Sequence, residues 1–146
     1  MQNHGTKNRI SFHQARSLAD GALPIGLAHK VGLKRDIAHG QVVGWAGAGP
    51  YRSRSAYAGI AEHSVYVARA ARGTGAGRAA LDALCQVYAT RGFRKIVSRI
   101  FPENTASLAV HERCGFRVLG VYRRHGQLEG VWRDCVVVEK LLDERA

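Results

Sequence analysis

The sequence predicts a single mixed α/β domain, and three observations support this fold class. The chain has 146 residues, enough to bury one hydrophobic core but too few for two independent domains. Segments that alternate between apolar and polar residues, as β-strands do, are separated by segments with the period of an amphipathic helix. Their order is strand, strand, helix, strand, helix, strand, strand, which is typical of a sheet with helices packed on it.

Residues 1–40 carry the weakest structural signal. Turn-forming and basic residues are mixed there without a sustained period, and the only element that they suggest is a helix over residues 13–19. The start of the chain is basic and poor in acids, but the apolar patch that follows is short and contains Pro24. A secretory signal is therefore not expected, and a transit-type leader is a weaker alternative. No apolar run in the sequence approaches the roughly 20 residues of a membrane-spanning helix.

Two strands are predicted next. Residues 41–51 alternate and contain a Gly-Pro pair near their end, which terminates a strand. After a polar link, residues 63–68 place Val65 and Val67 on one face, as expected for a half-buried strand.

The segment after this strand is predicted to be an amphipathic helix that ends at Gly92. Its apolar residues recur at the spacing i, i+3, i+4 and i+7, which places them along one face. These residues are Leu81, Leu84, Cys85 and Tyr88.

Four further elements complete the predicted domain. Pro102 ends a buried strand, Asn104 can cap the helix that follows, and Gly115 ends that helix. The last two strands are joined by a turn over residues 125–130. The four elements are strand 95–101, helix 105–114, strand 116–124 and strand 131–141.

The chain is strongly basic, with 22 Lys and Arg against 11 Asp and Glu and a net charge of +11. Such a charge favours polyanions or a small phosphorylated ligand as partners. The basic residues are scattered and do not alternate with aromatic residues, which disfavours nucleic acid as the partner.

The three cysteines indicate a reducing compartment. Cys85, Cys114 and Cys135 are odd in number and far apart, and none belongs to a C-x-x-C pair. We therefore expect buried thiols in a cytoplasmic protein, with no disulfide framework and no metal site.

The clearest functional signal is the glycine-rich turn between the second predicted strand and the first helix. Gly73, Gly75 and Gly77 lie between Arg72 and Arg78. A helix start offers backbone N–H groups without partners and the positive end of the helix dipole. Glycine lets the backbone approach an anion closely and adopt positive φ. The turn is therefore predicted to bind phosphate.

Two common nucleotide motifs do not fit this turn. A P-loop needs a Lys and then a Ser or Thr after its last glycine, and neither follows Gly77. A dinucleotide-binding turn needs the spacing G-x-G-x-x-G, and here the third glycine comes one residue too early. A purely structural turn would explain one glycine but not three.

The turn matches the pattern R-x-x-G-x-G through Arg72, Gly75 and Gly77, and this region resembles the GNAT acetyltransferases. A later segment, PENTASLAVHERCGF (102–116), is similar to the family motif in which an Asn begins a helix and a Gly-Phe pair follows it. The resemblance extends over residues 41–142.

Two longer runs resemble the phosphinothricin acetyltransferase branch of this family. The first is YRSRSAYAGIAEHSVYVARAARGTGAG (51–77) and the second is FRVLGVYRRHGQLEGVWRD (116–134). The subgroup associated with arsinothricin, an arsenic analogue of phosphinothricin, is the most similar. The resemblance implies acetyl transfer from acetyl-CoA to the amino group of such an amino acid, a detoxification reaction that gives resistance to it.

The resemblance also implies a fold. We expect a GNAT-like, mostly antiparallel sheet with helices on both faces, formed by residues 1–146 as one domain. Residues 41–142 would be the acetyl-CoA-binding and catalytic core, and residues 1–40 an atypical or shortened N-terminal segment. The family is commonly dimeric, so a homodimer is expected.

Most of the implied site residues concern acetyl-CoA. The family holds the pyrophosphate on the glycine turn, presents the thioester along the preceding strand and contacts the CoA arm from the second helix. The corresponding residues are Val65, Tyr66, Val67, Arg72, Gly73, Thr74, Gly75, Ala76, Gly77, Arg78, Asn104 and Ser107. A backbone N–H near Val67 would stabilise the oxyanion, and Asn104 serves equally well as a helix cap.

Glu62 and His111 are implied as catalytic residues. An α-ammonium group is mostly protonated at neutral pH, so a carboxylate such as Glu62 must accept its proton. His111 lies where many members of the family have a Tyr that protonates the CoA thiolate, and it could act as acid, base or hydrogen-bond donor.

The acceptor would carry a carboxylate and a phosphinate- or arsonate-like group. Guanidinium groups suit both because they donate in a planar fork. The resemblance implies Arg52, Arg54 and Tyr57 as its ligands, with His125 a weaker candidate.

Two alternatives remain open from the sequence. In the first the acceptor is another amine, with methionine sulfoximine as one option, and in the second the chain is a CoA- or polyanion-binding module without activity. Turnover on an amine separates the enzymes from the module.

Overall fold

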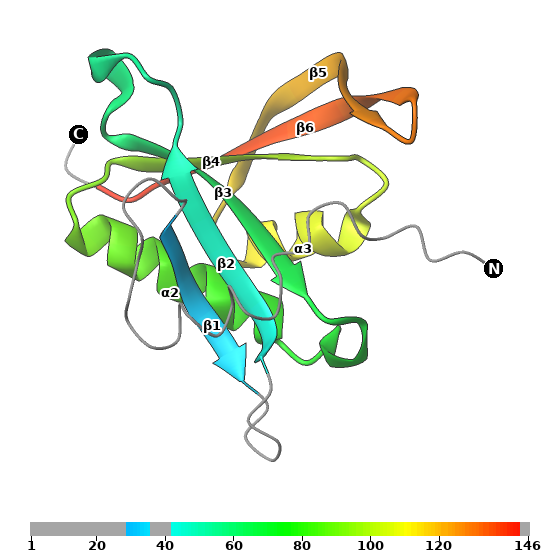
Figure 1. Cartoon of the computed structure of the whole chain (residues 1–146), viewed down its shortest axis with the longest axis horizontal. Coiled ribbons are helices and arrows are strands. Elements are labelled where there is room, and N and C mark those ends of the chain that lie inside the picture. The colour runs from blue at the N-terminus through cyan, green and yellow to red at the C-terminus, as the bar shows by residue number, and fades with distance from the viewer. Residues whose placement is uncertain (1–28, 36–41, 144–146) are drawn as a thin grey trace.

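The computed structural model describes residues 29–35 and 42–143, which form a mixed α/β domain (Figure 1). Within them, six strands form one sheet in the order β1-β2-β3-β4-β6-β5. The strands are β1 (His29–Arg35), β2 (Val42–Pro50), β3 (Ile60–Val67), β4 (Lys95–Ile100), β5 (Arg117–Leu128) and β6 (Val131–Leu141). The helices are the α-helices α2 (Ala76–Thr90) and α3 (Thr105–Arg113) and the 3₁₀ turns η1 (Ser55–Tyr57) and η2 (Arg69–Ala71).

The sheet is mostly antiparallel, as predicted. Only β3 and β4 pair in parallel, and the connection between them contains α2, because a parallel pair needs a crossover. The tight turn between β5 and β6 joins an antiparallel hairpin that lies at one edge of the sheet.

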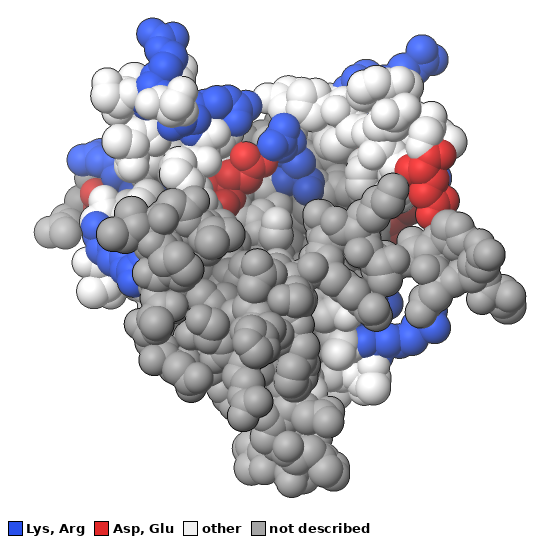
Figure 2. Space-filling model, in the orientation of Figure 1, with Lys and Arg blue, Asp and Glu red and all other residues white. Residues whose placement is uncertain are grey.

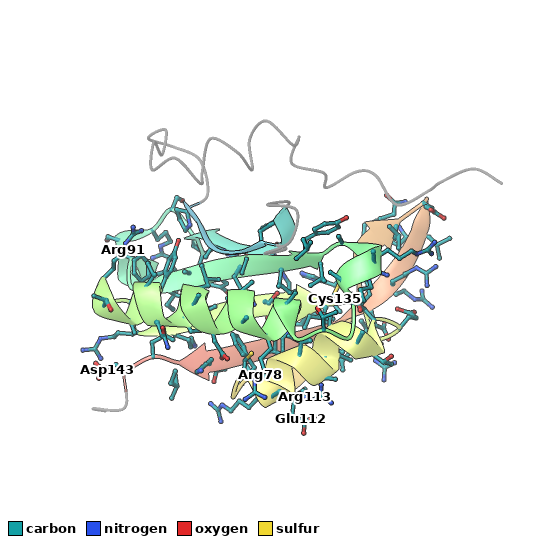
Figure 3. All side chains as sticks on the ribbon, turned by 90° about the horizontal axis from the view of Figure 1, so that it is seen from below. Arg78, Arg91, Glu112, Arg113, Cys135 and Asp143 are labelled. Atoms are coloured by element: carbon teal, nitrogen blue, oxygen red, sulfur yellow. The ribbon has the colours of Figure 1, made fainter. Side chains whose placement is uncertain are left out.

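Both described α-helices pack on the same face of the sheet (Figure 3). The predicted apolar face of α2 is buried there, and the hydroxyl of Tyr88 donates to the carbonyl of Ala48 at 2.9 Å. The helix ends before Gly92, which has φ 84° and so provides the predicted C-terminal stop. The expectation of helices on both faces concerns, in part, residues outside the described ranges.

The predicted elements from residue 41 onwards are confirmed, with shifted boundaries. The main correction is the predicted turn over 125–130, because β5 continues to Leu128 and pairs there with Val131. Glu129 and Gly130 alone turn the chain, with φ 52° and 78°, which is the geometry of a two-residue hairpin turn. A second correction is β1, which lies in the segment without a predicted strand. The predicted helix 13–19 lies outside the described residues.

The three cysteines are free and buried, as predicted. Burial raises the pKa of Cys85 to about 11 and that of Cys114 to about 12, and it also raises the pKa of Cys135. No helix within the described ranges has the length and apolar character needed to span a membrane.

The hairpin of β5 and β6 leaves much apolar surface exposed. Neither face of β5 is covered by the other described elements, and it is an edge strand. The exposed large apolar residues of the hairpin are Val118, Leu119, Val121, Tyr122, Leu128, Val131 and Trp132. We call this set the hairpin surface.

Candidate active site

The site begins where the parallel strands β3 and β4 separate. They pair only from Ile60 with Lys95 to Glu62 with Val97, after which β3 stays with β2 and β4 stays with β6. At the first step beyond the last pair, the Ser98 hydroxyl donates to the carbonyl of His63 at 3.0 Å. The divergence opens a gap in the middle of the sheet.

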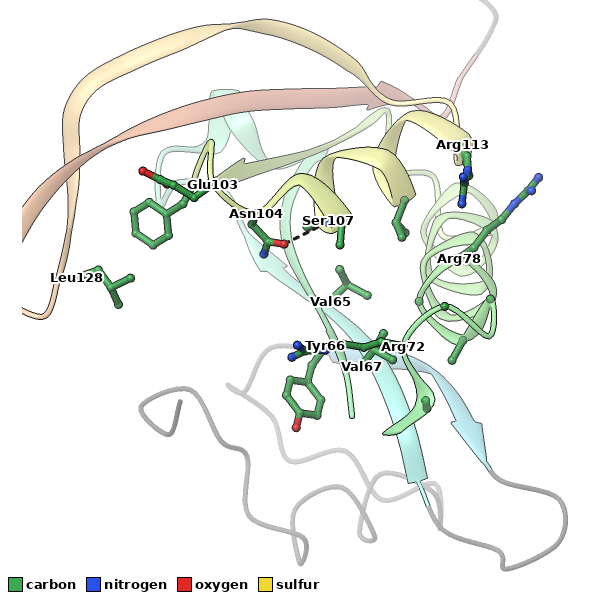
Figure 4. A pocket seen from close by; sticks show the side chains of 18 of the residues that line it. Val65, Tyr66, Val67, Arg72, Arg78, Glu103, Asn104, Ser107, Arg113 and Leu128 are labelled. Carbon is green, nitrogen blue, oxygen red and sulfur yellow. Dashed lines mark hydrogen bonds between the residues drawn. The ribbon is translucent and has the colours of Figure 1, made fainter. Parts of the chain in front are cut away.

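A cavity of about 930 Å³ lies along this gap, between the end of β3, the glycine turn and α3 (Figure 4). Every residue predicted to hold acetyl-CoA lines it except Thr74, whose hydroxyl donates to the carbonyl of Ala71. Eight further lining residues were not predicted from the sequence, and these are Ala71, Phe101, Glu103, Ala106, Val110, Arg113, Leu128 and Arg133.

The glycine turn forms one end of the cavity with its backbone exposed. Gly73 and Gly75 have φ 78° and 85°, values that L-residues rarely adopt. No side chain caps α2, and its first backbone hydrogen bond runs from Ala79 to the carbonyl of Gly75 at 3.0 Å. The N–H groups of residues 76–78 therefore have no partner within the described part of the chain.

Gly77 is required for a different reason. A Cβ atom at this position would lie 3.0 Å from Cγ2 of Val67, closer than side chains normally pack. The start of α2 can therefore lie directly against the end of β3, which keeps the turn and the strand in one wall of the cavity.

Four arginines line the cavity: Arg72, Arg78, Arg113 and Arg133. Arg78 and Arg113 lie at the same end of the cavity, although they come from different helices (Figure 4). Free N–H groups, the helix dipole and guanidinium groups together suit a pyrophosphate. In the same cavity, Nε of Arg133 is buried without a hydrogen-bond partner among the described residues, so a donor is available to a ligand.

The start of α3 forms the opposite wall. Asn104 caps this helix, as predicted, because its side-chain oxygen accepts from the N–H of Ser107 at 3.1 Å. Both residues also line the cavity, so the cap and the predicted contact with CoA are compatible.

His111 lies on the buried side of α3 and does not line this cavity. Its Nε2 lies 2.9 Å from Nε2 of His63, and its Nδ1 lies 2.7 Å from the carbonyl oxygen of Ser107. Nδ1 of His63 lies 3.0 Å from the carbonyl oxygen of Val97, and the ring of Phe116 packs on both imidazoles. His111 was predicted as a site residue, but its partner His63 was not.

Both imidazoles are held neutral by this environment. Burial is the main cause that lowers the pKa of His63 to about 3, and the neighbouring His111 lowers it further. Burial also lowers the pKa of His111, against the contact with the Ser107 carbonyl, which raises it. His111 therefore lies in the site as a neutral ring, connected to the cavity through Ser107.

Glu62 faces the opposite side of the sheet from His63, because side chains alternate along β3. Arg99 of β4 donates to Oε1 of Glu62 from Nε at 2.8 Å and also from Nη2. The remaining guanidinium nitrogen, Nη1, lies 3.2 Å from Nε2 of His125 in the hairpin. Arg99 was not predicted as a site residue, because it belongs to no local motif.

The predicted acceptor residues Arg52, Arg54 and Tyr57 lie in the exposed loop between β2 and β3. The loop leaves the sheet beside the start of β3, where Tyr51 N–H donates to the Ile60 carbonyl at 3.3 Å. Arg52 packs on the ring of Tyr51, with its guanidinium carbon 4.2 Å from the ring centroid. These residues therefore lie at the end of the sheet where Glu62 lies, and no hydrogen bond or ion pair among the described residues joins them to it.

A sheet whose two parallel strands separate over a glycine-rich anion site defines a fold of the acetyltransferase class. The family model "Acetyltransferase (GNAT) family" matches residues 11–116, which is most of the chain. The protein belongs to the GNAT acetyltransferase family. The match begins 30 residues before Gln41, so it includes most of the segment in which the sequence showed no resemblance.

Relatives of two kinds and one solved structure show which members of the family are similar to this chain. An L-methionine sulfoximine/L-methionine sulfone acetyltransferase of Pseudomonas aeruginosa is 37% identical over 73% of this chain and 62% of its own length. A phosphinothricin N-acetyltransferase of Alcaligenes faecalis is 36% identical over 89% of this chain and 64% of its own. The phosphinothricin acetyltransferase of Sinorhizobium meliloti, solved in complex with acetyl-CoA, superposes with TM-score 0.70 at 33% identity, over 77% of this chain and 60% of that one. This chain thus spans less than two thirds of the length of these proteins.

Proposed function

We propose that the protein transfers an acetyl group from acetyl-CoA to the amino group of an amino acid. The observation that carries this proposal is the cavity over the separated strands, which is lined by the glycine turn, the end of β3 and the start of α3. Acetyl-CoA would supply an activated acetyl thioester there. The turn, with Arg72, Arg78 and Arg113, would hold its pyrophosphate, and β3 would hold the pantetheine arm beside its free edge.

The reaction then needs a base and a hydrogen-bond donor to the oxyanion. Glu62 is proposed to accept the proton of the acceptor's ammonium group, since its Oε2 has no hydrogen bond to the described residues. A backbone N–H of β3 near Val67 is proposed to stabilise the developing oxyanion. His111 is proposed to act as a neutral hydrogen-bonding group through Ser107, because its lowered pKa disfavours a cationic acid.

For the acceptor we propose a phosphinothricin- or arsinothricin-like amino acid, bound by Arg52, Arg54 and Tyr57. Relatives named phosphinothricin N-acetyltransferase support this choice. A second candidate is methionine sulfoximine or methionine sulfone, which the names of other relatives support at similar identity. A CoA-binding module without activity is the remaining alternative.

Acceptor profiling tests the proposal. Purified protein is given acetyl-CoA and a panel containing phosphinothricin, arsinothricin, methionine sulfoximine, methionine sulfone and the common amino acids, and thiol release is followed. Turnover on one of the first four, well above the rest, is the expected result. Saturable binding of acetyl-CoA without turnover on any amine would identify the module instead.

We further propose that the protein is a homodimer joined through the hairpin surface. An edge strand exposed on both faces and rich in apolar side chains is rarely left open to water in a monomer. A cytoplasmic location is the prediction that the cysteine usage supports.

A further inference from the structure

Arg99 and Glu62 form an ion pair on the face of the sheet that carries no described helix. Glu62 comes from β3 and Arg99 from β4, beside the last pair before these strands separate. The side chain of Arg99 is 37% exposed and that of Glu62 is 25% exposed, so solvent reaches both. In the orientation of Figure 1, acidic (red) and basic (blue) side chains meet in the hollow between the β2–β3 loop and the hairpin of β5 and β6 (Figure 2).

The guanidinium of Arg99 has one occupied edge and one nearly free edge. Its Nε and Nη2 atoms both donate to the single oxygen Oε1 of Glu62. On the other edge, the one contact is with Nε2 of His125, which must accept because a guanidinium can only donate. Of the five N–H groups, two thus have no partner among the described residues, one on Nη1 and one on Nη2.

Glu62 shows the complementary pattern. Only Oε1 is engaged by Arg99, and Oε2 has no hydrogen bond to a described residue. The pair therefore presents a negatively charged oxygen without a partner among the described residues next to a positively charged edge whose one contact is with His125. An α-amino acid presents the opposite pair of charges on groups attached to one carbon, an ammonium and a carboxylate.

We propose that Arg99 binds the α-carboxylate of the acceptor through its outer edge, while Glu62 takes the ammonium. This inference rests on the proposed acetyl transfer and adds a residue that selects free amino acids over other amines. His125 would give up its contact with Nη1 to the carboxylate, since a guanidinium binds an anion more strongly than a neutral imidazole. The ion pair also fixes Glu62 at one oxygen and leaves the other oriented for the proton.

The test compares an amino acid with its own carboxamide. Methionine sulfone and methionine sulfone amide share the amine and side chain, and differ in the group that Arg99 would bind. We expect the wild-type protein to favour the free acid in kcat/KM. In Arg99→Met this acid-to-amide ratio should fall at least roughly tenfold, the usual effect of losing a charge-assisted hydrogen bond.

The ratio separates recognition from any general damage. Loss of the ion pair with Glu62 affects the acid and the amide alike, so it cancels in the ratio. Arg91→Met is the matched control, because Arg91 is an exposed arginine directly after α2 (Figure 3) and makes no hydrogen bond or ion pair with Glu62 or His125 among the described residues. It should leave the ratio unchanged, and Arg99→Lys should restore the ratio in part because it keeps the charge without the fork.

An unchanged ratio in Arg99→Met would overturn the proposal. A loss confined to phosphinothricin, without an effect on methionine sulfone, would also overturn it, because Arg99 would then bind the side-chain anion. If the wild-type protein acetylates no amine, the proposed function fails separately. Calorimetry then measures the binding of the same acid and amide to the wild-type protein and to Arg99→Met. A lower acid-to-amide ratio of affinities in Arg99→Met supports the role of Arg99, and an unchanged ratio overturns it.

Discussion

Glu62 has one oxygen held by Arg99 and one without a hydrogen bond to the described residues, which is a suitable state for a general base that must stay oriented while it accepts a proton. Replacing it with Gln keeps the shape and removes the charge. Glu62→Gln should lower kcat on the best acceptor by roughly 10²-fold or more, the usual contribution of a general base.

The dissociation constant of acetyl-CoA should stay within about twofold in Glu62→Gln, because Glu62 does not line the cavity. Steady-state kinetics and calorimetry measure the two quantities. Glu112→Gln is the control, since Glu112 is exposed on α3 (Figure 3). Equal turnover in both variants would remove Glu62 from the role of base.

The buried His63–His111 pair makes three close contacts through its ring nitrogens, but two neutral imidazoles have only two N–H groups to donate. The contacts are His63 with Val97, His111 with Ser107 and the two Nε2 atoms with each other. The shorter of the two carbonyl contacts, 2.7 Å at Nδ1 of His111 against 3.0 Å at Nδ1 of His63, favours the proton on Nδ1 of His111. His63 therefore carries its proton on Nε2 and donates it to His111.

This pair makes stability depend on pH. The pKa of His63 is about 3 in the folded protein and about 6.5 when unfolded, so the unfolded chain binds more protons between these values. The contribution of His63 to stability is complete above pH 6.5 and is lost as the pH falls toward 3. Between pH 7 and pH 5, His63 alone should lower the free energy of unfolding by about 2 kcal/mol.

Urea unfolding at several pH values tests this dependence. His63→Gln cannot take up a proton, so its free energy of unfolding should fall less between pH 7 and pH 5. Parallel curves for the wild type and this variant would show that His63 is not the group responsible.

At the level of elements, the glycine turn and α2 provide a matched pair of positions. Gly75 and Gly92 flank the same helix with φ 85° and 84°, and an added Cβ would meet nothing within 4 Å at either site. Gly75→Ala and Gly92→Ala should each cost about 1–2 kcal/mol of stability from backbone strain. Only Gly75→Ala should weaken acetyl-CoA binding, because only this turn lines the cavity.

Thermal unfolding and calorimetry of the two variants give both quantities. If Gly92→Ala weakened acetyl-CoA binding as much as Gly75→Ala, the effect would come from helix strain and not from the site.

The sequence predicts those elements whose signal is local. Strand β3, the glycine turn and α2 are consecutive, so one motif covers most of one cavity wall, and Asn104 marks the start of the other. The positions of Arg99 and His63 in the site depend on how β3 pairs with β4, and the paired residues lie more than 30 positions apart in the sequence. No local pattern gives that register, and so both were missed. Strand β1 was missed because its apolar residues are few and are flanked by basic ones.

At the level of the whole molecule, the hairpin surface determines the expected assembly. Trp132 is 60% exposed near the tip of the hairpin, where it pairs with Gln127, and a charge there would oppose burial against a second copy. Trp132→Asp should convert a dimer into a monomer in light scattering coupled to gel filtration.

Leu141→Asp is the control for this experiment. Leu141 is 54% exposed at the other end of β6, where it pairs with Lys95 and lies outside the hairpin surface. This variant should remain dimeric. A wild-type protein that is monomeric at micromolar concentration would contradict the proposed interface.

The buried cysteines decide how the reaction is best observed. The released CoA can be followed with an aromatic disulfide reagent, which gives colour with any thiolate. Cys85 and Cys114 have pKa values of about 11 and 12, so almost none of their thiols is ionised at neutral pH. Cys135 is also buried, with a raised pKa. The folded enzyme should therefore give almost no background colour, and the absorbance should count released CoA alone until the chain unfolds.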